Sequence, residues 1–246
     1  MLVEDDLILT SAQLHALQIG ENSEVRSAIS GSQYLWPYNV LKYQLDSTMS
    51  PRHKKVIRKT LRNLQKKLNL CVRFVQAKFG DRVIVTSYGS GCASNLGYLG
   101  GTQHLQLPWN CMSPRTIEHE FLHALGFHHT HSRSDRDLHI TVIKDNIRDD
   151  KYYNFNKYTS SQTYGLPYDF DSVMHYGDEA WSKNGRKTIQ AKDPANQGRI
   201  GRGQGVSPGD IEMVKRHYGC SEQTKTTTKP TDKGGIKIRL KNKYKI

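Results

Sequence analysis

The clearest pattern of hydrophobic positions along the chain lies between residues 51 and 68. Apolar side chains recur there at intervals of three and four, which is the spacing of one face of an α-helix. They are Val56, Ile57, Leu61, Leu64 and Leu68. Ser50 and Pro51 precede them, a pair typical of an N-cap and a first helical residue. The sequence therefore predicts a long helix with one buried stripe, whose interleaved Lys and Arg residues face solvent.

Short runs rich in β-branched residues flank this helix and predict strands. The runs are residues 39–45, 72–76, 82–87 and 104–107, and turns containing glycine separate the last three. Ser113 and Pro114 then start a second helix. We expect a mixed twisted sheet with two long helices in the N-terminal half.

The pattern changes after residue 129, where the chain becomes turn-rich and aromatic. Ser207 and Pro208 open a final helix that ends near Tyr218 and Gly219. The expected fold class is therefore α+β, with an irregular C-terminal subdomain and a closing helix. We expect a cleft between the two halves.

The composition predicts one principal domain, and the net charge indicates one class of partner. The chain has 246 residues, 36% of them hydrophobic, which is enough for one principal core. Its formal net charge of +13 is uneven, because residues 1–26 carry −4 and residues 221–246 carry +6, leaving +11 between them. This charge favours binding to a polyanionic matrix such as a heparin-like glycosaminoglycan. The alternative is that the charge serves only to keep the protein soluble. No nucleic-acid partner is expected.

Residues 221–246 form a Thr- and Lys-rich basic tail, in which residues 224–231 are typical of a linker. The last eleven residues alternate between apolar and basic side chains. We expect these residues to form a disordered tail, because a strand without a partner is unstable. The alternative is a strand that binds a polyanion.

Four cysteines, Cys71, Cys92, Cys111 and Cys220, include no C-x-x-C pair, so disulfides are expected. Three connectivities are possible. The strands and turns between Cys92 and Cys111 favour a local bridge, which leaves Cys71 with Cys220. Disulfides indicate an oxidising compartment, and we therefore expect a secreted, extracellular protein. No apolar run reaches transmembrane length and no signal peptide is present, so we expect a precursor whose leader is missing from this sequence.

An eleven-residue stretch, HEFLHALGFHH, runs from His119 to His129. On a helix, His119 and His123 lie one turn apart on the same face, so both imidazoles can reach one metal ion. Glu120 lies beside that ion, where a carboxylate can hold a water molecule and take its proton. Gly126 can adopt a positive φ, end the helix and bring His129 to the metal. Three histidines leave one position open, which favours a single catalytic Zn²⁺ and hydrolysis.

Two further histidines, His128 and His131, stand next to this motif. The spacing from Gly126 selects His129 as the third ligand. We expect His128 and His131 to lie on a solvated rim.

The stretch satisfies the metzincin motif H-E-x-x-H-x-x-G-x-x-H. Arg133 to Asp137 reads RSDRD, and Tyr168 to Tyr176 reads YDFDSVMHY. Both segments resemble those of astacin-type zinc metalloendopeptidases, and the second resembles the segment of that family that is called the Met-turn. The resemblance covers most of residues 1–220 and implies a metzincin-like zincin catalytic domain over residues 27–220.

The resemblance also implies roles for individual residues. Met174 would form the hydrophobic floor below the zinc, and Tyr176 would bind zinc at rest before moving to stabilise the oxyanion. A phenol suits the second role because it can donate a hydrogen bond to developing negative charge. Residues 90–107 would hold substrate as an antiparallel edge strand. Astacins pair their cysteines as proposed above, but Thr130 stands where they usually carry the Glu that helps to anchor the mature N-terminus.

Residues 1–26 resemble part of an astacin propeptide. Such propeptides commonly place an aspartate over the zinc in an F-x-G-D motif, and Asp6 is the corresponding residue here. Val3 and Asp5 replace the Phe and the Gly, so Asp5 competes for the role, and a plain acidic turn is the alternative interpretation of this segment. The family's mature N-terminus would fall at Ser27, so a trypsin-like protease would activate the zymogen by cleaving after Arg26. The sequence therefore predicts a secreted zinc metalloendopeptidase that hydrolyses extracellular proteins.

Overall fold

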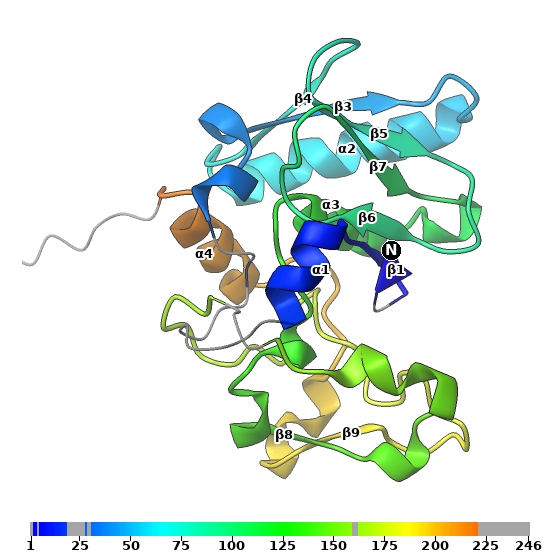
Figure 1. Ribbon diagram of the computed structural model, residues 1–246, viewed down its shortest axis with the longest axis vertical. Coiled ribbons are helices and arrows are strands. Elements are labelled where there is room, and N and C mark those ends of the chain that lie inside the picture. Colours follow the sequence, from blue (N-terminus) through cyan, green and yellow to red (C-terminus); the bar gives the residue numbers. More distant parts are fainter. Residues whose placement is uncertain (1, 4, 19–27, 29–30, 159–161, 221–246) are drawn as a thin grey trace, which may run out of the picture.

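Two sheets organise the part of the chain that the structure, a computed structural model, describes, namely residues 2–3, 5–18, 28, 31–158 and 162–220. A seven-stranded sheet has the order β1-β2-β6-β7-β5-β3-β4, and β8 pairs with β9 in a second sheet. The strands are β1 (Leu2–Val3), β2 (Leu7–Ile8), β3 (Val40–Leu45), β4 (Arg73–Gln76), β5 (Arg82–Thr86), β6 (Ala93–Asn95), β7 (Thr102–Gln106), β8 (Ile140–Val142) and β9 (Ile189–Ala191). Figure 1 shows the large sheet in the upper half, β8 and β9 in the lower half, and β1 beside the junction.

The large sheet is mixed, as the sequence predicts. Strand β3 runs parallel to β4 and β5, and β5 runs parallel to β7. Strand β6 is antiparallel to β7, and its other edge pairs in parallel with β2. Residues from the N-terminal segment therefore occupy the free edge of β6.

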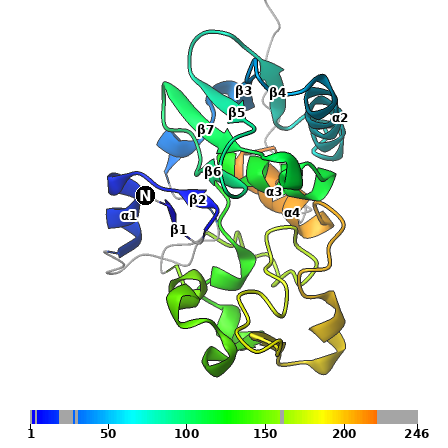
Figure 2. The same ribbon diagram turned by 90° about the vertical axis from the view of Figure 1, so that its right-hand side faces the viewer.

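Four α-helices lie in the described part of the chain: α1 (Ser11–Gln18), α2 (Pro51–Lys67), α3 (Pro114–Ala124) and α4 (Pro208–His217). Ser50 caps α2 by accepting a hydrogen bond from the His53 amide, and Ile57, Leu61 and Leu64 are buried. Helix α3 packs against α2 and β6. Figure 2 shows α2 and α3 on the same side of the sheet, with α3 nearer the junction of the two halves.

The main core lies between the large sheet and these helices. Phe121 of α3 makes edge-to-face contacts with Tyr43 of β3 and Phe74 of β4, at centroid distances of 6.1 and 5.7 Å. The Trp36 indole donates a hydrogen bond of 2.8 Å to the Ala124 carbonyl at the end of α3. These contacts fix the second predicted helix against the sheet.

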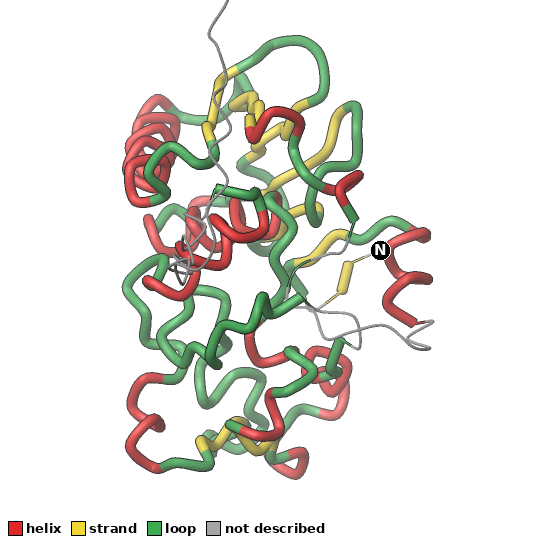
Figure 3. The backbone as a smooth tube through the Cα atoms, turned by 90° about the vertical axis from the view of Figure 1, so that its left-hand side faces the viewer, coloured by secondary structure: helices red, strands yellow, loops and turns green. Residues whose placement is uncertain are grey.

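The C-terminal half is built largely from turns, as Figure 3 shows. It has its own hydrophobic cluster, which includes Ile140, Phe170 and Ile189. The 3-10 helices of the described chain are η1 (Ser32–Tyr34), η2 (Pro37–Asn39), η3 (Trp109–Cys111), η4 (Thr130–Ser132), η5 (Arg136–Leu138), η6 (Lys144–Asn146), η7 (Asp149–Phe155) and η8 (Pro194–Arg199). The α+β class, with a mixed sheet above an irregular lower half and a closing helix, is confirmed.

Two disulfides cross-link the described chain. Cys92 pairs with Cys111, and Cys71 pairs with Cys220, the two pairs that the spacing favoured. The second bridge joins the segment after α2 to the end of α4. Among the described residues, no helix has both the length and the apolar character needed to span a membrane.

Candidate active site

Helix α3 carries the first half of the histidine motif. Ser113 caps its N-terminus by accepting a hydrogen bond from the Thr116 amide. The helix ends at Ala124, and Gly126 adopts a φ of 104°, which a residue with a Cβ rarely does. The chain turns there and brings His129 back toward His119 and His123, the geometry that the motif predicts.

The three imidazoles of His119, His123 and His129 converge through their Nε2 atoms. The Nε2 of His119 lies 3.1 Å from that of His123 and 3.3 Å from that of His129. The other ring nitrogens of His119 and His123 face the carbonyls of Val173 and Phe127, at 2.8 and 2.6 Å. A carbonyl can only accept, so each Nδ1 carries the proton and each Nε2 presents a lone pair.

This donor set suits a metal ion. One ligand atom from each of Asp6, His119, His123 and His129 can be chosen so that all four lie within 4.8 Å of one another. Burial lowers the pKa of His123 to about 4, so the ring is neutral at pH 7, the form that binds metal. Zinc sites typically contain histidine ligands whose second ring nitrogen donates a hydrogen bond to a backbone carbonyl, and a carboxylate is also a common zinc ligand.

Asp6 lies directly over the histidines. Its Oδ2 is 3.1 Å from the Nε2 of His129 and 3.3 Å from that of His119. Burial opposes its ionisation, but the surrounding imidazoles hold the pKa of Asp6 well below its usual range. The Ser94 amide of β6 donates a 2.8 Å hydrogen bond to the Asp6 carbonyl and so fixes the segment.

Asp5 points elsewhere, so it is Asp6 that faces the histidines. The Asp5 carboxylate is bound by Lys151, Tyr153 and Asn154 of η7. Burial acts to raise the pKa of Asp5, but these hydrogen bonds outweigh it and leave the pKa below its ordinary value. No motif indicated this cluster, because about 146 residues of chain separate its two sides.

Glu120 lies beside the histidines and is 1% exposed. Among the described residues, its Oε2 has no hydrogen-bond partner. Burial, with the nearby negative charge of Asp6, raises the pKa of Glu120 well above its usual range. The residue lines a cleft of about 500 Å³ together with His119 and Tyr176. A carboxyl group in this position can exchange a proton with a molecule in the cleft.

Tyr176 and Met174 belong to the segment between residues 168 and 176. The ring of Tyr176 packs against that of His129, with centroids 4.6 Å apart, and borders the cleft. Met174 is buried, and its carbonyl accepts a hydrogen bond from the Thr130 amide. The segment between residues 168 and 176 therefore reaches the site as its resemblance to the Met-turn implies.

His128 and His131 do not form a solvated rim, and that prediction is wrong. They are 3% and 0% exposed. His128 packs on Tyr158 at a centroid distance of 4.2 Å, and His131 stacks on Tyr176 at 4.0 Å. Burial lowers the pKa of His128 to about 3. Aromatic packing in the turn-rich half covers both rings, and neither belongs to the group of ligand atoms.

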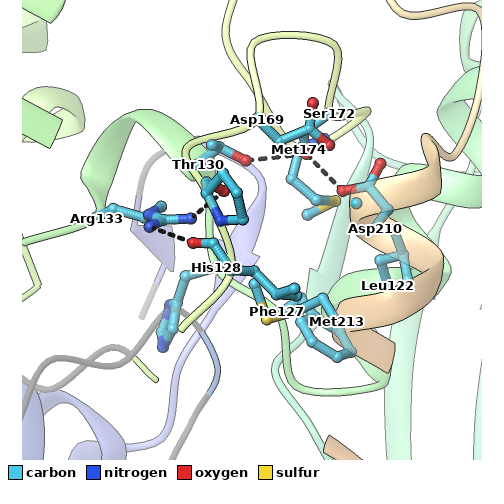
Figure 4. Close-up of a pocket in the computed structure, with 13 residues that line it drawn as sticks. Leu122, Phe127, His128, Thr130, Arg133, Asp169, Ser172, Met174, Asp210 and Met213 are labelled. Carbon is cyan, nitrogen blue, oxygen red and sulfur yellow. Dashed lines mark hydrogen bonds between the residues drawn. The ribbon is translucent and has the colours of Figure 1, made fainter. Parts of the chain in front are cut away.

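Thr130 belongs to a buried polar chain behind the site. Its hydroxyl donates a 2.9 Å hydrogen bond to Ser172, which donates one of 2.6 Å to Asp210. Figure 4 shows Asp210 on helix α4 pointing toward Ser172, with Met174 beside them. These residues line a cavity of about 40 Å³, and burial raises the pKa of Asp210 to about 6.

The proposed cleavage site, Arg26 and Ser27, lies outside the described residues, as does the tail from 221 to 246. Ala28 is described and buried, and it forms an antiparallel β-bridge with Phe127. The chain thus passes close to the histidine motif just after the expected cleavage site.

Comparison with known proteins identifies the family. The family model Astacin (Peptidase family M12A) matches residues 28–219. The chain belongs to the astacin family. It is 32% identical over 216 residues to zinc metalloproteinase nas-6 of Caenorhabditis elegans, covering 87% of this chain and 62% of that protein. It is 35% identical over 199 residues to meprin A subunit beta of Rattus norvegicus, covering 80% of this chain and 28% of that protein.

A solved structure of the family has the same fold. High choriolytic enzyme 1, a hatching enzyme zinc-protease from the medaka fish Oryzias latipes, superposes with a TM-score of 0.73 at 35% identity. The match covers 79% of this chain and all of that one. Astacin-family proteases use one catalytic zinc, and the histidine cluster has the donors for it. The chain spans less than two thirds of the length of the curated relatives named above.

Proposed function

We propose that residues 27–220 form the catalytic domain of a zinc endopeptidase. The convergence of three imidazole Nε2 atoms beside the buried carboxyl group of Glu120 carries this conclusion. His119, His123 and His129 would hold the ion. Zinc bound there supplies a positive charge that polarises a peptide carbonyl and a water molecule.

The side chains around the ion have separate roles in the reaction. Glu120 accepts a proton from the attacking water and passes it to the leaving amine. The Tyr176 hydroxyl donates a hydrogen bond to the carbonyl oxygen as negative charge develops on it. Strand β6 holds the peptide by backbone hydrogen bonds, and Met174 supports the floor beneath the histidines.

Hydrolysis of casein by the trypsin-treated protein tests this function. We expect hydrolysis that a chelator abolishes and added Zn²⁺ restores, because the histidines need the ion to act. Protein that stays fully active after complete removal of metal would contradict the proposal. Glu120→Gln protein, treated identically, is the control for traces of trypsin.

We also propose that residues 1–26 are a propeptide that keeps the enzyme inactive. Asp6 lies against the histidines, and β2 takes the edge of β6 that a substrate would need. Cleavage after Arg26 by a trypsin-like protease would release this segment. We expect trypsin to raise activity at least about tenfold and an Arg26→Gln variant to resist activation at this bond. Equal activity before and after removal of residues 1–26 would reject the zymogen.

We propose secretion and extracellular protein substrates for the same chain. The two disulfides support this, because such bonds persist in oxidising compartments. The tail from 221 to 246 remains a proposed basic appendage. Detection of the protein in culture medium after expression with its full precursor is the direct test.

A second candidate function is binding to a heparin-like polyanion, and we propose that α2 carries it. Residues 47–80 contain ten Lys or Arg and no Asp or Glu, which is +10 of the net charge of +13. In α2, five basic residues spaced three or four apart share one side. They are Lys55, Arg58, Lys59, Arg62 and Lys66. Among the described residues, only Lys67 of this helix forms an ion pair, with Glu118.

Heparin chromatography of two matched variants tests this surface. One replaces Lys55, Lys59, Arg62 and Lys66 with Gln. The other replaces four exposed basic residues outside α2, namely Lys144, Arg186, Lys192 and Arg202. Both lose four charges, but we expect only the first to elute at markedly lower salt, because retention depends on local contacts. Equal shifts would point to net charge alone.

A further inference from the structure

The ring of Tyr176 packs against other aromatic rings, and one of them lies nearly flat on it. His131 stacks on Tyr176 with centroids 4.0 Å apart and ring planes 24° apart. His129 and Phe155 meet the same phenol obliquely, with their planes at 54° and 84° to it. A flat neighbour lets a ring slide in its own plane but stops it from moving toward that neighbour, because the atoms are already in contact. His131 therefore limits the directions in which the phenol can move.

The imidazole of His131 is itself held in place. It is 0% exposed, and its Nε2 donates a 2.8 Å hydrogen bond to the Asn154 carbonyl of η7. The backbone carbonyl of His131 accepts a 2.9 Å hydrogen bond from the guanidinium of Arg136, which is also buried. Phe155 packs edge-to-face on the imidazole at a centroid distance of 5.6 Å. Both the ring and the backbone of this residue are anchored, so its flat face is a fixed wall.

The position of the Tyr176 hydroxyl matters for the proposed reaction, in which it donates a hydrogen bond to the carbonyl oxygen. Tyr176 is only partly buried and borders the cleft, so the protein surrounds only part of its ring. Displacement of a positioned group by about 1 Å can cost about 10²-fold in rate. The contacts on the buried side of the ring therefore decide how precisely the hydroxyl is placed.

We propose that His131 is a positioning residue for Tyr176, whose imidazole face guides the phenol into place beside the histidine cluster. His131 acts without binding the metal, since it does not belong to the group of ligand atoms. This inference rests on the proposed peptidase function and adds to it a residue that acts through Tyr176. It also gives a function to an imidazole that is buried two positions beyond His129.

Three variants of the trypsin-activated protein test this role. His131→Leu and His131→Gln both remove the ring, and Gln keeps an amide that can donate to the Asn154 carbonyl. His131→Phe keeps a flat ring and loses that donor. We expect Leu and Gln to lower kcat on a peptide substrate about tenfold or more, with KM and zinc content within about twofold of wild type. Phe should restore kcat to within about threefold.

Two results of these measurements would overturn the proposal. One is wild-type kcat in the Gln variant, which would mean that the hydrogen bond to Asn154 is enough without the ring. The other is a fall in kcat that a fall in zinc content matches, which would place the effect at His129.

A double-variant cycle shows whether the effect passes through Tyr176. The Tyr176→Phe background lacks the hydroxyl, so His131→Leu should change kcat there by less than about twofold. A merely structural role for His131 would lower kcat by the same factor in both backgrounds, and that result would reject the proposal. The same cycle with His131→Gln keeps the test decisive if the Leu variant does not fold.

His128→Leu is the matched control. The imidazole of His128 is also buried, at 3% exposed, and it packs on the ring of Tyr158. We expect the kcat of this variant to stay within about twofold of wild type. A loss equal to that of His131→Leu would assign the effect to general packing around His129 and overturn the positioning role.

A binding measurement separates failure of this inference from failure of the peptidase. The probe is a phosphinic peptide, whose tetrahedral anionic group resembles an attacked peptide bond and can accept a hydrogen bond from Tyr176. We expect His131→Leu to weaken its binding about tenfold, but less than about twofold in the Tyr176→Phe background. This coupling without any turnover would reject the peptidase alone, whereas turnover without the coupling rejects the positioning role.

Discussion

His119 and His123 owe their orientation to carbonyl groups outside helix α3. The carbonyls of Val173 and Phe127 accept the Nδ1 hydrogens, so hydrogen bonds within the protein already orient both rings. Such supporting contacts commonly change metal affinity 10- to 100-fold when they are removed. At the scale of single residues, the site therefore includes backbone atoms as well as the motif side chains.

Replacement of Glu120 with Gln separates proton transfer from metal binding. The amide keeps the size of the side chain but cannot accept the proton of the attacking water. We expect kcat to fall by about 10²- to 10⁴-fold with zinc content unchanged. Kinetics on casein, together with metal analysis of the same protein, measure both quantities. Glu179→Gln, at an exposed site, should behave as wild type.

Replacement of His129 with Ala removes the third imidazole of the cluster. Two protein ligands hold zinc less tightly than three, so we expect zinc affinity to fall by about tenfold or more and activity to fall with it. Competition with a chromogenic chelator gives the affinity. The exposed His104→Ala variant is the control, and normal zinc binding by His129→Ala protein would mean that another residue completes the site.

The sequence predicts some of these residues much better than others. His119, His123, His129 and Glu120 follow from spacing on one helix and its exit turn. The burial of His128 and His131 does not, because it depends on rings that come from distant turns.

At the scale of elements, the three main helices begin where Ser-Pro pairs stand. Ser50, Ser113 and Ser207 each accept a backbone hydrogen bond at an N-cap. These helices were predictable because cap and periodicity agree locally.

The hydrophobic pattern did not predict strand β6, since its three residues Ala93–Asn95 are all buried and show no alternation. Only the family resemblance placed an edge strand within residues 90–107. Its pairing with β2 joins residues that are 87 positions apart in the sequence, Leu7 with Ser94 and Ile8 with Asn95.

Replacement of Ser207 with Ala tests the start of α4. Its hydroxyl accepts from the Asp210 amide at 2.8 Å, and Asp210 completes a capping box. Ser207 is also buried and donates to Asp169. We expect the free energy of unfolding to fall by about 1–2 kcal/mol in urea. Ser50→Ala removes an exposed cap of α2 and should cost less, about 0.5–1 kcal/mol.

At the scale of the whole molecule, Cys71–Cys220 links the helix–sheet layer to the closing helix. Its two cysteines are 149 residues apart in sequence. A bridge across such a long loop restricts the unfolded chain strongly. We expect the Cys71→Ala, Cys220→Ala double variant to lose about 3–5 kcal/mol of unfolding free energy, measured by urea titration. A loss below about 1 kcal/mol would show that the bridge adds little to the stability that packing already provides.

Buried histidines make the stability of the fold dependent on pH. Burial lowers the pKa of His217 to about 4, whereas the unfolded chain has the ordinary value near 6.5. The unfolded state therefore binds more protons between these values, and stability falls as pH falls through this range. For His217 alone the loss is about 2 kcal/mol between pH 7 and pH 5. His217→Gln protein should show a shallower decline in urea titrations over the same range.

The direction of β2 has a kinetic consequence. It runs parallel to β6, whereas a substrate on that edge is expected to run antiparallel, so the segment around Asp6 presents its amides in the opposite sense. A peptide bound in the reverse direction does not place a peptide carbonyl where the water molecule beside Glu120 can attack it. We therefore expect that the isolated precursor does not cleave itself in an intramolecular, first-order reaction. Instead, the rate of its maturation should rise in proportion to the concentration of the external protease.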